Sequence, residues 1–388
     1  MSITKAERRL PLVSVIVPNY NHAPFLEKRL RSISQQTHQN IEIILLDDAS
    51  TDDSQAILSQ FARTNKKVVS LNINESNSGL PIRQWNKGVS QAKGEYIWIA
   101  ESDDEAEPDF ISSLIALSNR FPSARVVYCD SVIIDEDSQT VAPYDYSSNQ
   151  YEDDGLWKRD FCENGRNFLA KFMLFRNLIP NVSAVLFKAS ALKSDLKQSS
   201  YKFCADWELY SRILASSDVA YCSKPMNKFR KHIQTTRWHN TKSYALELKE
   251  KVTLLKSLKQ AWPNDSLVQE NVKASLQYIY KNRHKHRRVA RLCEVIADID
   301  RSSLDQLCAF GANDIAELVV ETARKLNISC VVIDNHKANQ RCRGLNVSAL
   351  CDCTLSDKSV VVLCSLAYQA SMLAQLERHS FHGQIIRV

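Results

Sequence analysis

The amino-acid sequence predicts an α/β protein whose larger, N-terminal part is built on a mostly parallel β-sheet. Three observations support this fold class. Short apolar runs alternate with amphipathic segments over the first ~135 residues. Clusters of polar residues follow directly after several of the apolar runs. A second and shorter series of alternating segments starts near residue 306, which predicts a separate small α/β unit.

Five apolar runs of the first part are expected to be buried strands. A nearly continuous apolar run suits a strand that is covered on both faces, as strands of parallel sheets are. We expect these strands at residues 12–17, 41–46, 68–73, 96–100 and 124–134. Parallel neighbours need long crossover connections, so the segments between the runs should be helices.

The segments between the runs have the apolar spacing of helices that pack on a sheet. Leu26, Leu30 and Ile33 share one helical face after Pro24, a residue that suits the first turn of a helix. Ser50 or Thr51 can cap the next helix. The further helices are expected to bury three apolar sets: Ile57, Leu58 and Phe61; Ile82, Trp85 and Val89; Phe110, Leu114, Leu117 and Phe121.

The rest of the chain is less regular and then changes its periodicity twice. Between residues 136 and 240 we expect a strand at 181–188 and a helix at 207–215. The pattern is then helical up to about residue 299, with an interruption at Pro263. The last unit should contain strands at 306–310, 329–333 and 359–364 and a helix at 314–326. The predicted domains are therefore residues 1–240, a helical connector at 241–302, and residues 303–388.

Composition places the chain among ordinary globular proteins. Of its 388 residues, 44% are hydrophobic and 24% are charged. No apolar run approaches the ~20 residues of a membrane helix, and the polar N-terminus has no secretory h-region. The eleven cysteines lack the spacing of zinc ligands, since Cys351 and Cys353 are separated by a single residue. We therefore expect a cytoplasmic protein with reduced thiols.

The net charge of +6 owes much to one basic run, KNRHKHRRVAR, which begins with Lys281 and ends with Arg291. A solvated helix face is the plainest interpretation of this run. Peripheral contact with the anionic inner face of a membrane and contact with a phosphate-rich acceptor are functional alternatives. Nucleic acid is not an expected partner, because the run has no interleaved aromatic residues and no recognised motif accompanies it. The sequence does not predict an oligomeric state.

Polar clusters follow three of the predicted strands: NYN at residues 19–21, DD at 47–48 and ESDD at 101–104. Open α/β sheets bind ligands beyond the carboxyl ends of their strands. Two adjacent acids, Asp103 and Asp104, favour a hard divalent ion such as Mn²⁺ or Mg²⁺. A turn whose acids cap the next helix is the alternative, and the position at a strand end favours the metal.

These blocks together resemble a family 2 glycosyltransferase, which has the GT-A fold. VSVIVPNYN, IEIILLDDASTD and GEYIWIAESDD occur in the order that the family requires, and the resemblance covers residues 11–240. It implies a nucleotide-sugar donor and a divalent metal. By position it assigns the donor to Pro18, Tyr20, Asp48, Arg83, Asn86 and Asp103, and the metal to Asp104. Asp48 would contact the base, usually uracil, and Asp103 the ribose. Glu101 stands where many relatives have aspartate.

Two later blocks also match the family. CADWELYSRI resembles the block of the general base, which would be Asp206, although Ala205 replaces the usual preceding acid. In the absence of the resemblance, Asp206 could equally be a helix cap. FRKHIQTT resembles a block whose Arg230 or His232 would contact the diphosphate or the metal. One displacement assisted by one base implies an inverting transferase, which would act on a glycan or lipid-linked acceptor in surface polysaccharide synthesis.

Two other functions compete with this interpretation. A nucleotidyltransferase that makes a nucleotide sugar would use a similar sheet and metal, but it would normally have a glycine-rich loop where this chain has PNYNHAP. A non-catalytic glycan- or membrane-binding relative would keep its function without Asp104 and Asp206.

The last unit resembles a Rossmann-like module that has lost part of its nucleotide fingerprint. Gly311, Asn313 and Ala316 occupy the positions of the G-x-G-x-x-G motif, and Asp334 ends the next strand. A side chain at the second glycine position obstructs the approach of a pyrophosphate to the backbone. We expect a scaffolding or regulatory role for this unit rather than nucleotide binding.

Overall fold

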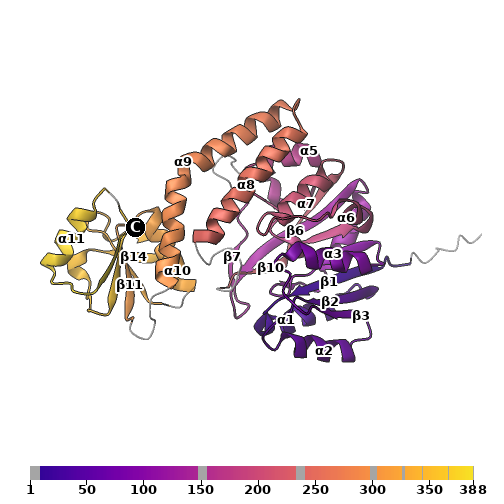
Figure 1. The fold of residues 1–388 in the computed structure, drawn as a ribbon, viewed down its shortest axis with the longest axis horizontal. Coiled ribbons are helices and arrows are strands. Elements are labelled where there is room, and N and C mark those ends of the chain that lie inside the picture. The colour runs from indigo at the N-terminus through magenta and orange to yellow at the C-terminus, as the bar shows by residue number, and fades with distance from the viewer. Residues whose placement is uncertain are drawn as a thin grey trace, which may run out of the picture. The chain divides into compact units, whose positions relative to one another are not determined.

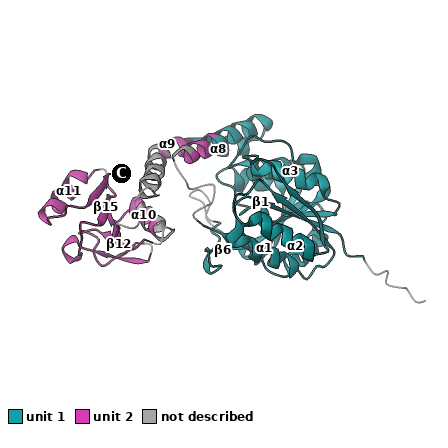
Figure 2. Cartoon of the chain, turned by 60° about the horizontal axis from the view of Figure 1, so that its bottom comes forward, with its two compact units in different colours: residues 1–231, 250–276 teal, residues 232–249, 277–388 magenta. Residues whose placement is uncertain are grey.

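A computed structural model describes residues 9–146, 155–232, 241–297, 304–325, 328–342, 344–365 and 367–387 of the chain. The chain divides into two compact units. The first contains residues 1–231 and 250–276, and the second contains residues 232–249 and 277–388 (Figure 2). The polar N-terminus, residues 1–8, lies outside the described residues. Among the described residues, no helix combines the length and the apolar character needed to span a bilayer.

The first unit contains a ten-stranded mixed sheet with the order β3-β2-β1-β4-β9-β6-β10-β5, in which β7 pairs with β6 and β8 pairs with β10 (Figure 1). The first four strands of this order are mutually parallel, and β9 is antiparallel to both of its neighbours. The strands are β1 (Val13–Asn19), β2 (Ile41–Asp47), β3 (Val68–Ile73), β4 (Tyr96–Ile99), β5 (Glu105–Ala106), β6 (Ala124–Ile134), β7 (Thr140–Pro143), β8 (Phe161–Asn164), β9 (Val185–Lys188) and β10 (Asp218–Arg230).

Helices cover both faces of this sheet. The bounds of the helices in the first unit are α1 (Ala23–Ser34), α2 (Ser54–Thr64), α3 (Pro81–Gln91), α4 (Phe110–Arg120), α5 (Gly165–Phe168), α6 (Ala189–Asp195) and α7 (Ala205–Leu214). The helices α8 (Thr241–Ala261) and α9 (Ser266–Ala297) each have residues in both units. Helices α1, α2 and α4 pack on the face that carries Val15 and Val17. Helix α3 covers the opposite face, where a Cβ atom on Gly88 would lie 2.3 Å from Cγ2 of Ile16. The short helical turns are Leu156–Lys158, Leu169–Met173 and Val182–Ala184.

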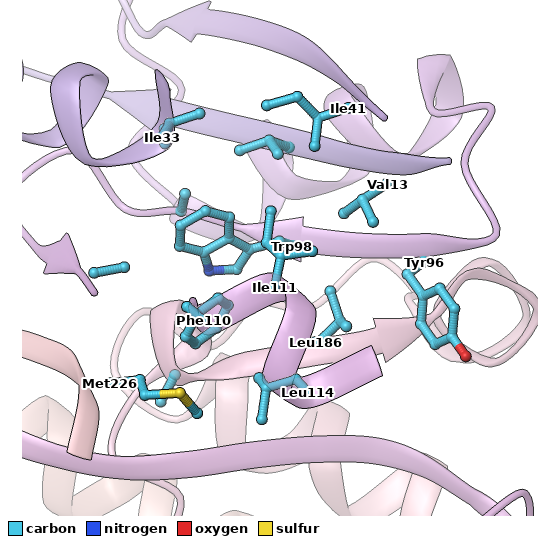
Figure 3. Close-up of a cluster of buried hydrophobic side chains, with 14 of the residues drawn as sticks. Val13, Ile33, Ile41, Tyr96, Trp98, Phe110, Ile111, Leu114, Leu186 and Met226 are labelled. Carbon is cyan, nitrogen blue, oxygen red and sulfur yellow. The ribbon is translucent and has the colours of Figure 1, made fainter. Parts of the chain in front are cut away.

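The core of the first unit is centred on Trp98 of β4 (Figure 3). The side chain is fully buried, and its ring stacks on Phe110 of α4 with a centroid distance of 4.6 Å. Its Nε1 donates a hydrogen bond to the Ser183 carbonyl at 2.8 Å, so burial of the indole leaves no donor unpaired. Leu114 and Leu186 pack in the same cluster. This core fixes the carboxyl end of β4, where the acidic cluster begins.

The five strands that the sequence predicts in the first part are confirmed to within two residues. The predicted cap of α2 is wrong. This helix begins at Ser54 after Asp53, and the Ser50 hydroxyl instead donates to the Asp47 carboxylate at 2.7 Å. Ser50 is therefore part of the loop after β2.

The mixed sheet differs from the sequence prediction in the strand at 181–188 and in four strands that were not expected: β5, β7, β8 and β10. The predicted strand at 181–188 starts with a helical turn, because the Asn181 side chain accepts the amide of Ala184 at 3.2 Å, and only Val185–Lys188 is extended. Strand β10 was not expected. Its pairing with β6 shifts register around Pro225, which interrupts the apolar alternation that would reveal a strand.

The second unit contains the second, smaller sheet, with the order β13-β14-β12-β11-β15-β16. All neighbouring strands are parallel except β13 and β14. The elements are β11 (Gln306–Phe310), α10 (Asp314–Lys325), β12 (Cys330–Ile333), β13 (Arg341–Cys342), β14 (Leu345–Ser348), a short turn at Leu350–Asp352, β15 (Ser359–Leu363), α11 (Gln369–Arg378) and β16 (Gln384–Arg387). The predicted strands and helix of this unit are present, with ends that differ by at most one residue.

Replacement of Leu114 by alanine should destabilise the first unit by ~2–5 kcal/mol, because it leaves a cavity in a core that is fully closed to solvent. Urea unfolding followed by circular dichroism would measure the change. Leu267 of α9 is 38% exposed and provides the matched control: Leu267→Ala should change stability by no more than ~0.5 kcal/mol. Equal effects of the two substitutions would contradict the description of this core.

Candidate active site

The polar clusters that follow β1, β2 and β4 gather at one edge of the sheet. These three strands are parallel neighbours, with Asn19 paired to Asp47 and Ile16 paired to Ile99. Their carboxyl ends therefore meet at the same edge. The amide of Asp48 donates to the Asn19 carbonyl at 2.9 Å and joins the first two clusters directly.

Asp48 organises the segment that leads into α3. One carboxylate oxygen, Oδ1, accepts from Asn74 Nδ2 at 2.6 Å, the Ser78 amide at 2.9 Å and Gln84 Nε2 at 2.8 Å. The other oxygen accepts the Ser78 hydroxyl at 2.7 Å. The side chain is only 6% exposed. Asp48 thus holds residues 74–84 against the end of β2, since each of these donors would otherwise need another partner.

The other residues that the resemblance assigns to the donor lie near the end of β1 and in α3. Pro18 is near the end of β1, and Tyr20 follows that strand with 42% of its surface exposed. Arg83 and Asn86 lie in α3, which Asp48 helps to orient. Arg83 is exposed, so its guanidinium is accessible from solvent.

Three carboxylates form a compact group after β4. One oxygen each from Glu101, Asp103 and Asp104 lie within 4.8 Å of one another. Glu101 and Asp103 are half-buried, whereas Asp104 is only 1% exposed. All of these atoms are hard oxygen donors, and the arrangement fits a divalent ion such as Mg²⁺ or Mn²⁺, which also takes ligands from a substrate phosphate.

The Asp104 carboxylate is anchored inside the protein. Its Oδ1 accepts the Arg230 amide at 2.9 Å, and its Oδ2 accepts Asn181 Nδ2 at 2.6 Å. The Arg29 guanidinium lies 3.8 Å from the same Oδ2. Burial and the nearby Asp103 carboxylate nevertheless raise the pKa of Asp104 to about 7, against the lowering effect of Arg29 and the hydrogen bonds. Asp104 therefore faces the protein, and Glu101 and Asp103 are the more accessible members of the group.

Two buried arginines hold the backbone of the acidic cluster. Arg29 Nε donates to the Glu101 carbonyl at 2.7 Å, and its Nη2 donates to the Ser183 hydroxyl at 3.1 Å. Arg230 Nε donates to the Asp103 carbonyl at 2.7 Å. Both side chains are fully buried. The positive charges of the two guanidinium groups offset the negative charges of the acids. Their hydrogen bonds to the backbone carbonyls fix the course of the loop that carries the carboxylates.

Asp206, the predicted base, lies in the first turn of α7 and is 8% exposed. Its Oδ2 accepts Asn177 Nδ2 at 3.0 Å. The Asn181 side chain, four residues further along the same segment, bonds to Asp104. Four residues span at most ~14 Å even when fully extended. The short segment 177–181 therefore joins the predicted base to the acidic cluster.

Arg230 and His232 were both expected to contact the diphosphate or the metal. The Arg230 guanidinium is committed to protein acceptors: besides the Asp103 carbonyl, it bonds to the Glu105 carboxylate and, at 3.0 Å, to the Ser138 hydroxyl. This geometry makes it a support of the cluster rather than an exposed donor-binding group. His232 is the first residue of the second unit, and its role as a metal ligand stays a prediction.

Sequence patterns did not reveal three of the residues that build the site: Arg29, Asn177 and Asn181. A signal for Arg29 was present, because it shares the apolar helical face of Leu26 and Leu30. A cation at such a position needs a buried partner. The two asparagines carry no comparable signal, since their importance depends on which carboxylates the fold brings to them.

In the second unit, hydrogen bonds to the side chains of Asp334 and Asn313 hold the loop after β11. Gly311 has a φ of +103°, as a tight turn requires, and the next amide, of Ala312, donates to the Asp334 carboxylate at 2.8 Å. Asn313 caps α10 by accepting the amides of Ile315 at 2.9 Å and Ala316 at 3.2 Å. Three amides that could otherwise bind a phosphate, those of Ala312, Ile315 and Ala316, are therefore already paired. The scaffolding or regulatory role of this unit stays a prediction.

The basic run that was considered for membrane contact lies in α9. The structure describes the side chains of Lys281 and Asn282, and those of residues 283–291 lie outside the described part. A contact of this run with anionic lipid stays a prediction.

Comparisons with known proteins agree with the geometry. Residues 14–179 match the family model for Glycosyl transferase family 2. An uncharacterized glycosyltransferase of Haemophilus influenzae is 26% identical over 226 residues, which are 57% of this chain and 66% of that protein. The GalNAc(5)-diNAcBac-PP-undecaprenol beta-1,3-glucosyltransferase of Campylobacter jejuni is 32% identical over 110 residues, 28% of this chain and 35% of the relative. The chain thus spans just under two thirds of the first relative and about a third of the second.

A solved structure shares the fold. The crystal structure of S. aureus TarS 1-349 in complex with UDP-GlcNAc superposes with a TM-score of 0.50 and 15% sequence identity, over 75% of this chain and 77% of that one. The first unit therefore has the GT-A fold that the sequence predicts.

The raised pKa of Asp104 should appear in the pH dependence of folding when metal is removed with EDTA. The folded state keeps a proton that the unfolded carboxyl releases near its ordinary pKa of about 4, so this group makes the protein less stable as pH rises towards 7. Asp104→Asn removes the effect. The stability difference between wild type and variant, from urea unfolding between about pH 5 and pH 8, should change by up to ~1.4 kcal/mol per pH unit below pH 7 and level off above it. Parallel pH profiles would contradict the buried position of this carboxyl.

Proposed function

Because the chain carries a domain of glycosyl transferase family 2 over residues 14–179, we propose that it is an inverting glycosyltransferase that moves a sugar from a uridine diphosphate donor to a glycan or lipid-linked acceptor. One observation carries this proposal: segment 177–181 joins a cluster of three carboxylates to a single separate carboxylate, Asp206. The first group suits a metal–diphosphate complex, and the second suits the activation of a hydroxyl.

Glu101 and Asp103 would hold the metal with their accessible oxygens. Asp104, assigned to the metal by the resemblance, would contribute mainly by fixing the loop, because its own oxygens accept from Arg230 and Asn181. A bound Mn²⁺ or Mg²⁺ would supply positive charge next to the negative charge that grows on the departing diphosphate.

The end of the sheet would hold the nucleotide. Tyr20 is exposed beside Pro18 and would contact the base, while Asp48 keeps residues 74–84 in place at the start of α3, the helix that carries Arg83 and Asn86. The TarS structure, which has a similar fold, contains UDP-GlcNAc, and this supports a uridine donor.

Asp206 would accept the proton of the acceptor hydroxyl as that oxygen attacks the anomeric carbon. Asn177 holds one of its oxygens at 3.0 Å and so restrains the direction of the carboxylate. A single displacement assisted by one base inverts the anomeric configuration. The Campylobacter jejuni relative is named for an undecaprenol-linked substrate, and this supports a lipid-linked acceptor.

Metal dependence of donor binding tests the first half of the proposal. In a calorimetric panel of nucleotide sugars, a UDP-sugar should bind at least about tenfold more tightly with Mn²⁺ than with EDTA, a difference of ~1.4 kcal/mol. Asp103→Asn should remove this difference. Asp357→Asn, at an exposed position of the second unit, is the matched control and should keep it. Equal binding with and without metal would contradict the proposal.

Removal of the base tests the second half. Asp206→Asn should lower the rate of sugar transfer by ~10²–10⁴ and leave the dissociation constant of the UDP–Mn²⁺ complex unchanged, because an amide keeps the shape of the side chain but cannot take a proton. Quantification of released UDP would measure the rate. A variant as fast as the wild type would exclude Asp206 as the base, whereas absence of transfer by the wild type itself would favour the non-catalytic alternative.

A further inference from the structure

The C-terminal half of α8 and the N-terminal part of α9 belong to the first unit. Residues 250–276 belong to the same compact unit as the GT-A sheet, although they follow it in the sequence, and both are teal in Figure 2. Leu254 and Leu255 of α8 and Val268 and Val272 of α9 are buried there. We call residues 250–276 the helical hairpin.

The hairpin places one carboxylate at the start of the helix that carries Asp206. Glu250 of α8 is 5% exposed. Its Oε1 accepts the amide of Lys202 at 2.8 Å, and its Oε2 accepts the amides of Phe203 at 2.8 Å and Cys204 at 3.1 Å. Helix α7 begins at the next residue, and no side chain of its own caps it.

Few other groups could make this contact. Three consecutive amides point at one carboxylate, and two of them are buried, so each would be costly to leave without an acceptor. A negative charge next to a helix N-terminus is also favourable. A glutamine at position 250 would offer a single acceptor oxygen and a second group that donates, and it could not satisfy all three amides.

The hairpin also holds the other segment on which Asp206 depends. Asn271 Nδ2 donates to the Ala170 carbonyl at 2.8 Å, and the buried Ser275 hydroxyl donates to the Leu174 carbonyl at 2.7 Å. The chain then continues to Asn177, whose side chain bonds to Asp206. Both sides of the Asp206 carboxylate are thus attached to the hairpin, one through α7 and the other through Asn177.

We propose that Glu250 is a positioning residue for the transfer reaction, which orients Asp206 by holding the three amides that precede α7. This inference rests on the proposed function of Asp206 as the base. Glu250 lies outside residues 14–179, the part of the chain that matches the family model, and the helix that carries it comes after the sequence blocks that resemble the family. If Glu250 has this role, the hairpin is part of the active site and not a linker.

The test compares Glu250→Gln with Glu270→Gln, a matched change at an exposed position of the same hairpin. Hydrogen exchange should show faster exchange of the amides of residues 202–204 in Glu250→Gln only. The rate of UDP release from a mixture of UDP-glucose, UDP-galactose, UDP-GlcNAc and UDP-GalNAc should fall by about 10–100-fold, since small misplacements of a catalytic group have effects of this size. The affinity for UDP with Mn²⁺ should stay within about twofold, which separates positioning from general loss of structure.

A double variant separates action through Asp206 from an independent effect. If Glu250 acts through Asp206, then Glu250→Gln should slow the Asp206→Asn enzyme no further, whereas independent effects would multiply. Unchanged exchange at residues 202–204, an unchanged rate, or multiplied losses in the double variant would each overturn the proposal. Failure of the wild type to bind UDP or release it would overturn the proposed function, and the exchange result would still show whether Glu250 holds these amides.

Discussion

The buried Asp104 carboxylate is the constraint on which the active-site edge depends. A carboxylate at this depth is costly unless donors and opposite charge compensate it. The fold supplies these from three separate parts of the chain: the Arg230 amide of β10, the Asn181 side chain and the Arg29 guanidinium of α1. Because the three parts must meet at Asp104, these contacts hold the three parts together at the edge of the sheet and fix the acidic loop.

The three neighbouring acids differ in direction and in burial. Asp104 is directed inward, whereas Glu101 and Asp103 are half-buried. The two buried arginines hold the loop by its carbonyl groups and not by the accessible carboxylates. A divalent cation bound at Glu101 and Asp103 would add further positive charge next to these acids.

Asp206 is attached to the acidic cluster by a short segment of the chain. Segment 177–181 contacts Asp104 at one end and Asp206 at the other, so the acidic cluster and Asp206 keep a fixed relation. The helical hairpin extends this rigid frame by holding residues 202–204 through Glu250. Precise placement of a base matters because proton transfer requires hydrogen-bond contact with the attacking oxygen.

The sequence alone determined the parallel strands and the edge at which the site forms, because continuous apolar runs specify buried strands and polar clusters directly follow them. It also indicated Asp206 and the acidic cluster through the family resemblance. Only the tertiary structure decided which acid faces inward, that Arg230 supports the loop, and that Asn177, Asn181 and Glu250 complete the frame. These roles depend on contacts between residues up to 127 positions apart, and no local pattern records such contacts.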